Sequence, residues 1–103
     1  MGAAGHFGSF TDFYPHYLRE HQNCTNRRLH FFGTSLVLVL VAASLAAGNW
    51  LLLVAVPLAG YGPAWVGHFY FERNKPATFY HPFYSLIGDF RMYADTWMGK
   101  IPF

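Results

Sequence analysis

The sequence predicts an all-α membrane protein, in which two spanning helices form a hairpin flanked by amphipathic helices at the membrane interface. Residues 31–47 and 50–67 contain no charged side chain, and only Gly48 and Asn49 separate these two runs. Each run of about 17 residues gives a helix of about 25 Å, the short end of what a bilayer core accepts. All seven basic residues lie outside the runs, before the first or after the second. The positive-inside rule therefore predicts that both termini are cytoplasmic.

The composition agrees with this interpretation. Hydrophobic residues make up 53% of the 103 residues and charged residues 12%, whereas soluble domains average about 45–50% and about 25%. The net charge of +2 follows from the topology and does not indicate nucleic-acid binding. We expect a disordered N-terminus over residues 1–8 and one membrane-embedded domain over residues 9–103. The compact chain favours a bacterial inner membrane, or the endoplasmic reticulum if the protein is eukaryotic.

The first amphipathic helix is expected at about residues 9–22. Ser9 and Asp12 have the spacing of a capping box, and aromatic side chains recur at helical spacing from Phe10 to His21. Aromatic rings are stable at the boundary between lipid and water. The pattern therefore predicts a short helix lying in the membrane interface.

The two spans are expected at about residues 26–47 and 50–73, with Thr25 or Asn26 capping the first. Small residues on the inward face of the first span, Gly33 and Thr34, would let the second helix approach closely. The second span contains prolines and glycines, which predict a kink. A last amphipathic helix, at about residues 83–98, is too polar to span the membrane.

Histidines indicate where the chemistry lies. His30 is 19 residues before Asn49 and His68 is 19 residues after it, so a hairpin brings both imidazoles to the same depth. His21 lies just outward of them, and Glu72 shares a helical face with His68. Imidazole is the commonest metal ligand, and polar groups gathered at one membrane depth are typical of function. The sequence therefore predicts a metal site at the cytoplasmic face.

Several nearby residues have two interpretations. Glu72 could be a ligand, orient a histidine, or pair with a neighbouring cation. His81 follows the second span and could reach the same patch, whereas His16 shares a face with charged residues and is expected to be solvated. Arg27 and Arg28 are ordinary membrane anchors unless one turns inward to bind a carboxylate. Nitrogen and oxygen ligands of this kind suit iron, zinc, copper or nickel equally well.

Two motifs carry a resemblance to a known family. They read His21-x-Asn23-x-x-Asn26-Arg27-x-x-His30 and Gly67-His68-x-x-x-Glu72-x-x-x-Pro76-Ala77. Over about residues 9–93 the chain closely resembles the small membrane family that includes the yeast endoplasmic-reticulum 2-hydroxy fatty acid dioxygenase of phytosphingosine breakdown, long labelled a domain of unknown function. Cys24 departs from the family pattern, in which proline usually follows the first asparagine.

The resemblance implies an Fe(II)-dependent dioxygenase that shortens a long-chain 2-hydroxy fatty acid by one carbon (alpha-oxidation), using dioxygen but no 2-oxoglutarate. The acyl chain would stay in the bilayer, and Arg27 or Arg28 would hold the substrate carboxylate. The implied metal ligands are His21, His30 and His68, with His81 or Glu72 as an optional fourth.

Other functions remain open at this point. The hairpin could anchor haem or another metal without dioxygenase activity, with His30 and His68 as axial ligands. It could also be a zinc hydrolase, or a passive module whose histidines only pack or sense pH. Two short spans give a thin bundle, which is consistent with a homodimer although no residue demands one.

Overall fold

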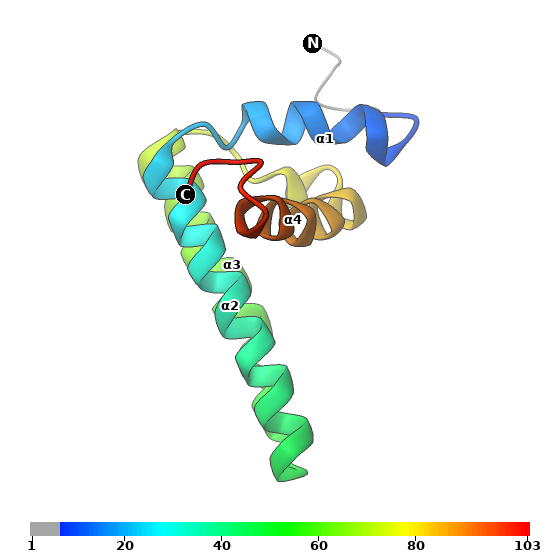
Figure 1. Cartoon of the computed structure of the whole chain (residues 1–103), viewed down its shortest axis with the longest axis vertical. Coiled ribbons are helices and arrows are strands. Elements are labelled where there is room, and N and C mark those ends of the chain that lie inside the picture. Colours follow the sequence, from blue (N-terminus) through cyan, green and yellow to red (C-terminus); the bar gives the residue numbers. More distant parts are fainter. Residues whose placement is uncertain (1–6) are drawn as a thin grey trace.

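The computed structural model describes residues 7–103, and within that range the chain is entirely helical, without strands (Figure 1). The all-α prediction is therefore confirmed. Residues 1–6 of the predicted disordered N-terminus lie outside the described residues. The elements, in chain order, are α1 (Phe10–Arg19), α2 (Cys24–Ala47), η2 (Trp50–Ala55), α3 (Val56–Val66), η3 (Gly67–Glu72), η4 (Ala77–Phe79) and α4 (Pro82–Trp97).

Helix α1 starts at the predicted cap. The Ser9 hydroxyl accepts a hydrogen bond from the Asp12 backbone N–H at 3.2 Å, which satisfies one of the free donors of the first turn. The helix ends at Arg19, before the predicted boundary, because the N–H groups of Glu20 and His21 bond three residues back and tighten the last turn. This tight turn leads the chain directly into α2.

Helix α2 begins two residues before the predicted start of the first span. Its cap is Asn23, whose side chain accepts from the N–H groups of Thr25 and Asn26, so the prediction that Thr25 or Asn26 caps the helix was wrong. The helix ends at Gly48, whose φ of 63° is in the left-handed region that glycine tolerates best.

The second long helix, Trp50–Glu72, is not one regular α-helix. It opens with the 3-10 segment η2, continues as α3 and closes with the π-helical turn η3. Like α2, it is long and apolar enough to cross a membrane. Most of both helices is exposed, including Leu45 at 79% and Leu58 at 75%. Such exposure is unfavourable in water but not in lipid, which indicates a membrane protein.

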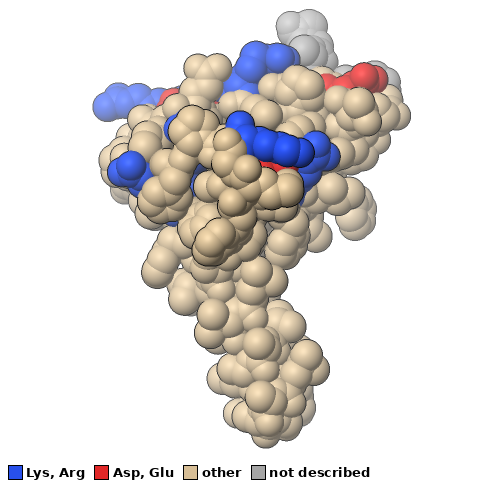
Figure 2. Space-filling model, viewed as in Figure 1, with Lys and Arg blue, Asp and Glu red and all other residues tan. Residues whose placement is uncertain are grey.

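The charged residues gather at one end of the molecule. Figure 2 shows Lys, Arg, Asp and Glu over the broad end, whereas the narrow end shows none on this face. In Figure 1 the narrow end consists of the two long helices alone, and α1 and α4 lie across the broad end. This arrangement is consistent with the predicted hairpin. The interfacial position of α1 and α4 and the cytoplasmic termini stay predictions.

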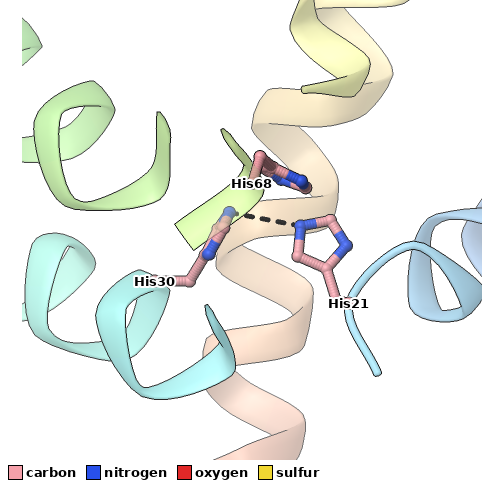
Figure 3. Close-up of side chains that lie close together, drawn as sticks. All are labelled: His21, His30 and His68. Carbon is pink, nitrogen blue, oxygen red and sulfur yellow. Dashed lines mark hydrogen bonds between the residues drawn. The ribbon is translucent and has the colours of Figure 1, made fainter. Parts of the chain in front are cut away.

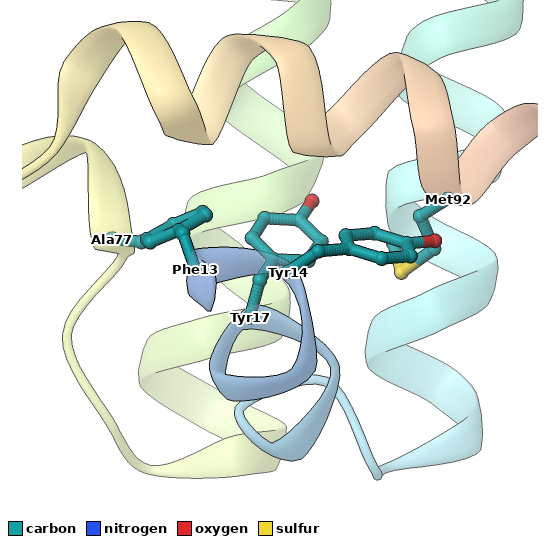
Figure 4. Close-up of a cluster of buried hydrophobic side chains, with 5 residues drawn as sticks. All are labelled: Phe13, Tyr14, Tyr17, Ala77 and Met92. Atoms are coloured by element: carbon teal, nitrogen blue, oxygen red, sulfur yellow. The ribbon is translucent and has the colours of Figure 1, made fainter. Parts of the chain in front are cut away.

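A small core joins α1 to α4 (Figure 4). Its buried members are Phe13, Tyr14, Tyr17, Ala77 and Met92. The Tyr14 hydroxyl donates to Asp95 Oδ2 at 2.8 Å, and the Tyr17 hydroxyl donates to Asp89 Oδ1. Burial is the largest cause that raises the pKa of both Tyr14 and Tyr17, so both phenols remain proton donors. Two phenol–carboxyl bonds therefore fix α1 on the inner face of α4.

The amphipathic helix α4 turns its polar face toward the protein interior. Its apolar stripe is exposed, including Phe83, Ile87 and Trp97, whereas Asp95 is buried against α1. The outward apolar face suits contact with lipid, and the inward acidic face meets tyrosine hydroxyls. The sequence periodicity identified the two faces but not which of them lies inward.

Close packing of the two long helices depends on Gly33. A Cβ at this position would lie 2.9 Å from the carbonyl oxygen of Ala59, which is backbone and cannot move aside. We expect Gly33→Ala to destabilise the protein by about 1–3 kcal/mol. Thermal unfolding in detergent, followed by circular dichroism, measures this loss. Gly62→Ala is the matched control, because its added Cβ would meet only the Leu58 side chain at 3.9 Å; equal losses in the two variants would contradict the prediction.

Candidate metal centre

Three histidines from separate segments meet at the broad end of the helix pair (Figure 3). His21 follows α1, His30 lies near the start of α2, and His68 lies in the π-helical turn η3. One ligand nitrogen from each ring lies within 4.8 Å of the others. The side chains are almost completely enclosed, with exposures of 1%, 5% and 2%. We call these three residues the histidine triad.

Hydrogen bonds fix the orientation of each ring. The Nδ1 atoms lie 2.6 Å from Tyr17 O, 2.9 Å from Asn26 O and 2.7 Å from Asn74 Oδ1, for His21, His30 and His68 respectively. A carbonyl oxygen can only accept, so each Nδ1 carries the proton and donates it. In a neutral ring, Nε2 then holds a free lone pair. The triad therefore presents three unprotonated nitrogens to its centre.

The unprotonated nitrogens have no hydrogen to share. His21 Nε2 and His30 Nε2 are 3.2 Å apart, and two lone pairs at that separation need a cation between or beside them. Two nitrogens each bound to one metal at about 2.1 Å, at a right angle, lie about 3 Å apart. The geometry of the triad therefore fits a metal ion that takes nitrogen ligands.

The environment of the triad favours the neutral ligand form. Burial lowers the pKa of His21 well below its ordinary value, and the neighbouring His30 and His68 rings lower it further. Because protonation competes with metal binding, a depressed pKa keeps this nitrogen available at neutral pH. The same burial disfavours a proton shared between two of the three rings.

Asn74 is a site residue that the sequence analysis missed. Its Oδ1 accepts the proton of His68 Nδ1, and its Nδ2 donates to the Glu20 carbonyl at 3.1 Å. The Asn74 backbone N–H also bonds the His68 carbonyl, closing the π-helical turn after Arg73, which has a φ of 61°. Partners of this kind set the tautomer and orientation of a metal-binding histidine. Only its position at the end of the second span could have drawn attention to it.

Asn26, a residue of the first histidine motif, also supports the triad. Asn26 is fully buried, and a Cβ on Gly67 would collide with its side chain. The glycine that precedes His68 therefore allows η3 to approach α2 at the level of the triad. This contact joins Asn26 of the first motif to Gly67 of the second.

The structure places the other predicted ligands outside the triad. The Glu72 carboxylate accepts from the backbone N–H of Asn23, joining η3 to the turn before α2. The ring of His81 lies 5.5 Å from the rings of Phe7 and Phe13, measured between centroids, within the aromatic packing around α1. Neither belongs to the group of ligand atoms that lie within 4.8 Å of one another.

The two arginines predicted to bind a carboxylate contact backbone carbonyls instead. Arg27 donates to His21 O at 3.2 Å and Gln22 O at 2.7 Å. Arg28 donates to Phe103 O at 3.1 Å and lies over the Phe103 ring. Arg27 therefore steadies the turn that carries His21, and Arg28 holds the last residue of the chain. Their role toward a substrate stays a prediction.

An apolar cavity of about 210 Å³ adjoins the triad between α2, α3 and α4. His30 lines it, and Asp89 is another polar residue in its wall that the sequence analysis did not select. The complete lining is His30, Thr34, Val37, Val56, Pro57, Gly60, Tyr61, Leu86, Asp89 and Phe90. A candidate metal centre thus opens onto a space suited to an apolar ligand.

These features define a class: small all-helical proteins with two helices of membrane-spanning character and a buried three-histidine group that could hold a metal ion. The chain belongs to the Mpo1-like family, described as 2-hydroxy-palmitic acid dioxygenase Mpo1-like, whose sequence model matches residues 7–101. This match confirms the family resemblance carried by the two histidine motifs. No curated protein and no solved structure matched the chain.

Removing the Asn74 side chain tests how the triad is held. In Asn74→Ala the His68 Nδ1 proton loses its acceptor, and we expect metal affinity to fall about 10- to 100-fold. Competition with a chromophoric chelator measures the affinity. Asn74→Asp keeps the acceptor and should retain tight binding, and Asn49→Ala, at the far turn, serves as the control. Unchanged affinity in Asn74→Ala would show that this bond does not position the ligand.

The low pKa of His21 predicts how stability depends on pH. The folded protein holds this ring neutral, whereas the unfolded chain binds a proton below about pH 6.5. Metal-free protein should therefore lose stability as the pH falls from 7.5 to 5, by at most about 1.4 kcal/mol per pH unit for this one proton. Thermal unfolding across this range tests the sign. His21→Gln should weaken the dependence, and an identical profile in the variant would contradict the assignment.

Proposed function

We propose that this protein is an Fe(II)-dependent membrane dioxygenase that shortens long-chain 2-hydroxy fatty acids by one carbon. The single observation that carries the proposal is the convergence of three unprotonated Nε2 atoms in a buried triad. Membership of a family described by a 2-hydroxy-palmitic acid dioxygenase supports the substrate class and the reaction. Bound iron would supply the redox chemistry and open coordination positions for dioxygen and substrate oxygens.

The charge of the triad favours an anionic substrate. Three neutral imidazoles would give Fe(II) a ligand set without a carboxylate, because Glu72 lies outside the triad and accepts from the Asn23 N–H. A fatty acid carboxylate would supply the missing negative charge. The burial of the triad excludes bulk water, which strengthens this attraction.

Hydrogen-bond partners within the chain orient the three histidine rings. Tyr17 O, Asn26 O and Asn74 Oδ1 hold the rings through their Nδ1 protons, so the Nε2 atoms need no rearrangement before they bind a ligand. Arg27 restrains the backbone carbonyl of His21. Such preorganisation lowers the cost of bringing two reactants together.

The membrane arrangement supports a lipid substrate. We propose that α2 and the helix Trp50–Glu72 form a two-span hairpin with the triad at the cytoplasmic face, where the basic residues lie. The cavity beside the triad is lined by residues of both long helices and α4, so an acyl chain would reach it from the bilayer. A bacterial inner membrane or the endoplasmic reticulum as the compartment, and a homodimer, stay predictions of the sequence.

The alternative of a haem hairpin is less consistent with the geometry. The ring centroids of His30 and His68 are 4.9 Å apart. Two imidazoles on opposite faces of a haem iron have centroids about 6 Å apart, with the porphyrin between them. The rings are therefore too close to be the predicted axial pair, and a mononuclear non-haem site is the better fit.

Oxygen uptake tests the proposal directly. Protein loaded anaerobically with Fe(II) should consume dioxygen when 2-hydroxypalmitate is added, and mass analysis should show a product one carbon shorter. We expect His21→Ala, His30→Ala and His68→Ala each to lower uptake at least about 100-fold through lost metal binding. His81→Ala is the matched control and should keep both iron and activity.

Three results would contradict the proposal. They are stoichiometric iron without oxygen uptake, uptake that survives in all three triad variants, and equal losses in His81→Ala and the triad variants. A Soret band in the purified protein would point to haem instead. Far-ultraviolet circular dichroism of each variant separates loss of the site from loss of the fold.

A further inference from the structure

Asp89 places a carboxyl group at the polar end of the cavity. Three neighbouring spaces between the helices are each lined by both His30 and Asp89. The Asp89 side chain is half-buried and faces the inner side of α4, opposite to the exposed apolar stripe of that helix. A ligand that extends from the triad into the cavity would therefore pass this carboxyl group.

The orientation of Asp89 is coupled to the triad. The Tyr17 hydroxyl donates to Asp89 Oδ1, and the Tyr17 ring stacks on His21 with centroids 4.0 Å apart. Gly88 lets α4 approach, because a Cβ there would lie 3.1 Å from the Tyr17 ring. The second oxygen, Oδ2, makes no hydrogen bond to any residue in the range 7–103 that the structure describes, so it is left to accept one from a ligand.

The cavity beyond Asp89 suits a hydrocarbon chain. Five of its ten lining residues are valine, proline, leucine or phenylalanine. With a volume of about 210 Å³, the cavity has room for several methylene groups. The first carbons of a fatty acid would fill it, with their polar end at His30, Thr34 and Asp89.

We propose that Asp89 is the residue that selects 2-hydroxy fatty acids over unsubstituted ones, by accepting a hydrogen bond from the substrate 2-hydroxyl while the first methylenes occupy the cavity. The inference rests on the proposed function, since it assigns a substrate contact within that site. An unsubstituted acid has no donor for the carboxylate and leaves it unpaired against apolar carbon, which is how a hydrogen-bonding site rejects an analogue that lacks the hydroxyl.

The ionisation of Asp89 is compatible with this role. Burial raises the pKa of Asp89 to about 6, with the hydrogen bond from Tyr17 acting in the opposite direction. At neutral pH the group is therefore mostly a carboxylate and an acceptor.

The experiment measures binding rather than turnover. Fe(II)-loaded protein in detergent is titrated anaerobically with 2-hydroxypalmitate and with palmitate, and the ratio of the two dissociation constants is the readout. We expect wild type to prefer the hydroxy acid by at least about tenfold, and Asp89→Ala to bring the ratio close to one. Asp12→Ala, an exposed carboxylate in α1, is the matched control and should keep the wild-type ratio.

Two further variants keep the test decisive if Asp89→Ala folds poorly. Asp89→Asn preserves the size of the side chain and an acceptor for Tyr17, and it should also lower the ratio. Tyr17→Phe frees Oδ1 and loosens the carboxyl group, so it should lower the ratio by a smaller factor. Circular dichroism and iron content show which variants keep the fold and the triad.

The outcomes separate the two proposals. A folded, iron-loaded Asp89 variant that keeps the wild-type ratio overturns the role of Asp89 while leaving oxygen uptake by wild type as evidence for the function. Equal binding of the two acids by an active wild-type protein overturns the role of Asp89 as well. A wild-type protein that binds no iron and consumes no dioxygen overturns both proposals.

Discussion

The hydrogen bonds that the three triad histidines donate through Nδ1 determine what the broad end of this molecule can do. Because each acceptor is an oxygen without a proton, each Nε2 must face the centre as a lone pair. A triad with free tautomers could satisfy itself by N–H···N bonds and would then need no metal. Here the choice is removed by Tyr17 O, Asn26 O and Asn74 Oδ1, and a cation is the partner that remains.

The irregular parts of the helices supply this arrangement. His21 lies in the tight turn after α1, and His68 lies in a π-helical turn that Asn74 closes. Regular helices use their backbone carbonyls internally, whereas helix ends and π-turns leave groups free for other partners. Gly67 then allows the π-turn to approach Asn26. The regular parts of the two long helices position the site, and the residues at or beside helix ends supply most of its side chains.

The sequence predicted the parts of this structure that depend on position along a helix. The two uncharged runs gave the long helices, and the equal distances of His30 and His68 from Asn49 placed both rings at one level. Contacts that depend on how helices pack were beyond the sequence. His81 enters an aromatic cluster because of the path of its loop. The periodicity of α4 separates an apolar face from a polar one, but only the packing shows that the apolar face is exposed and that Asp95 is buried.

The distribution of the triad along the chain also has a consequence for biosynthesis. His21 lies just before the first long helix and His30 near its start, whereas His68 lies near the end of the second and Asn74 just after it. The ribosome therefore adds about two thirds of the 103 residues, including both apolar segments, before the third histidine is in the chain. Any metal held by all three is therefore acquired only after both apolar segments have been synthesised.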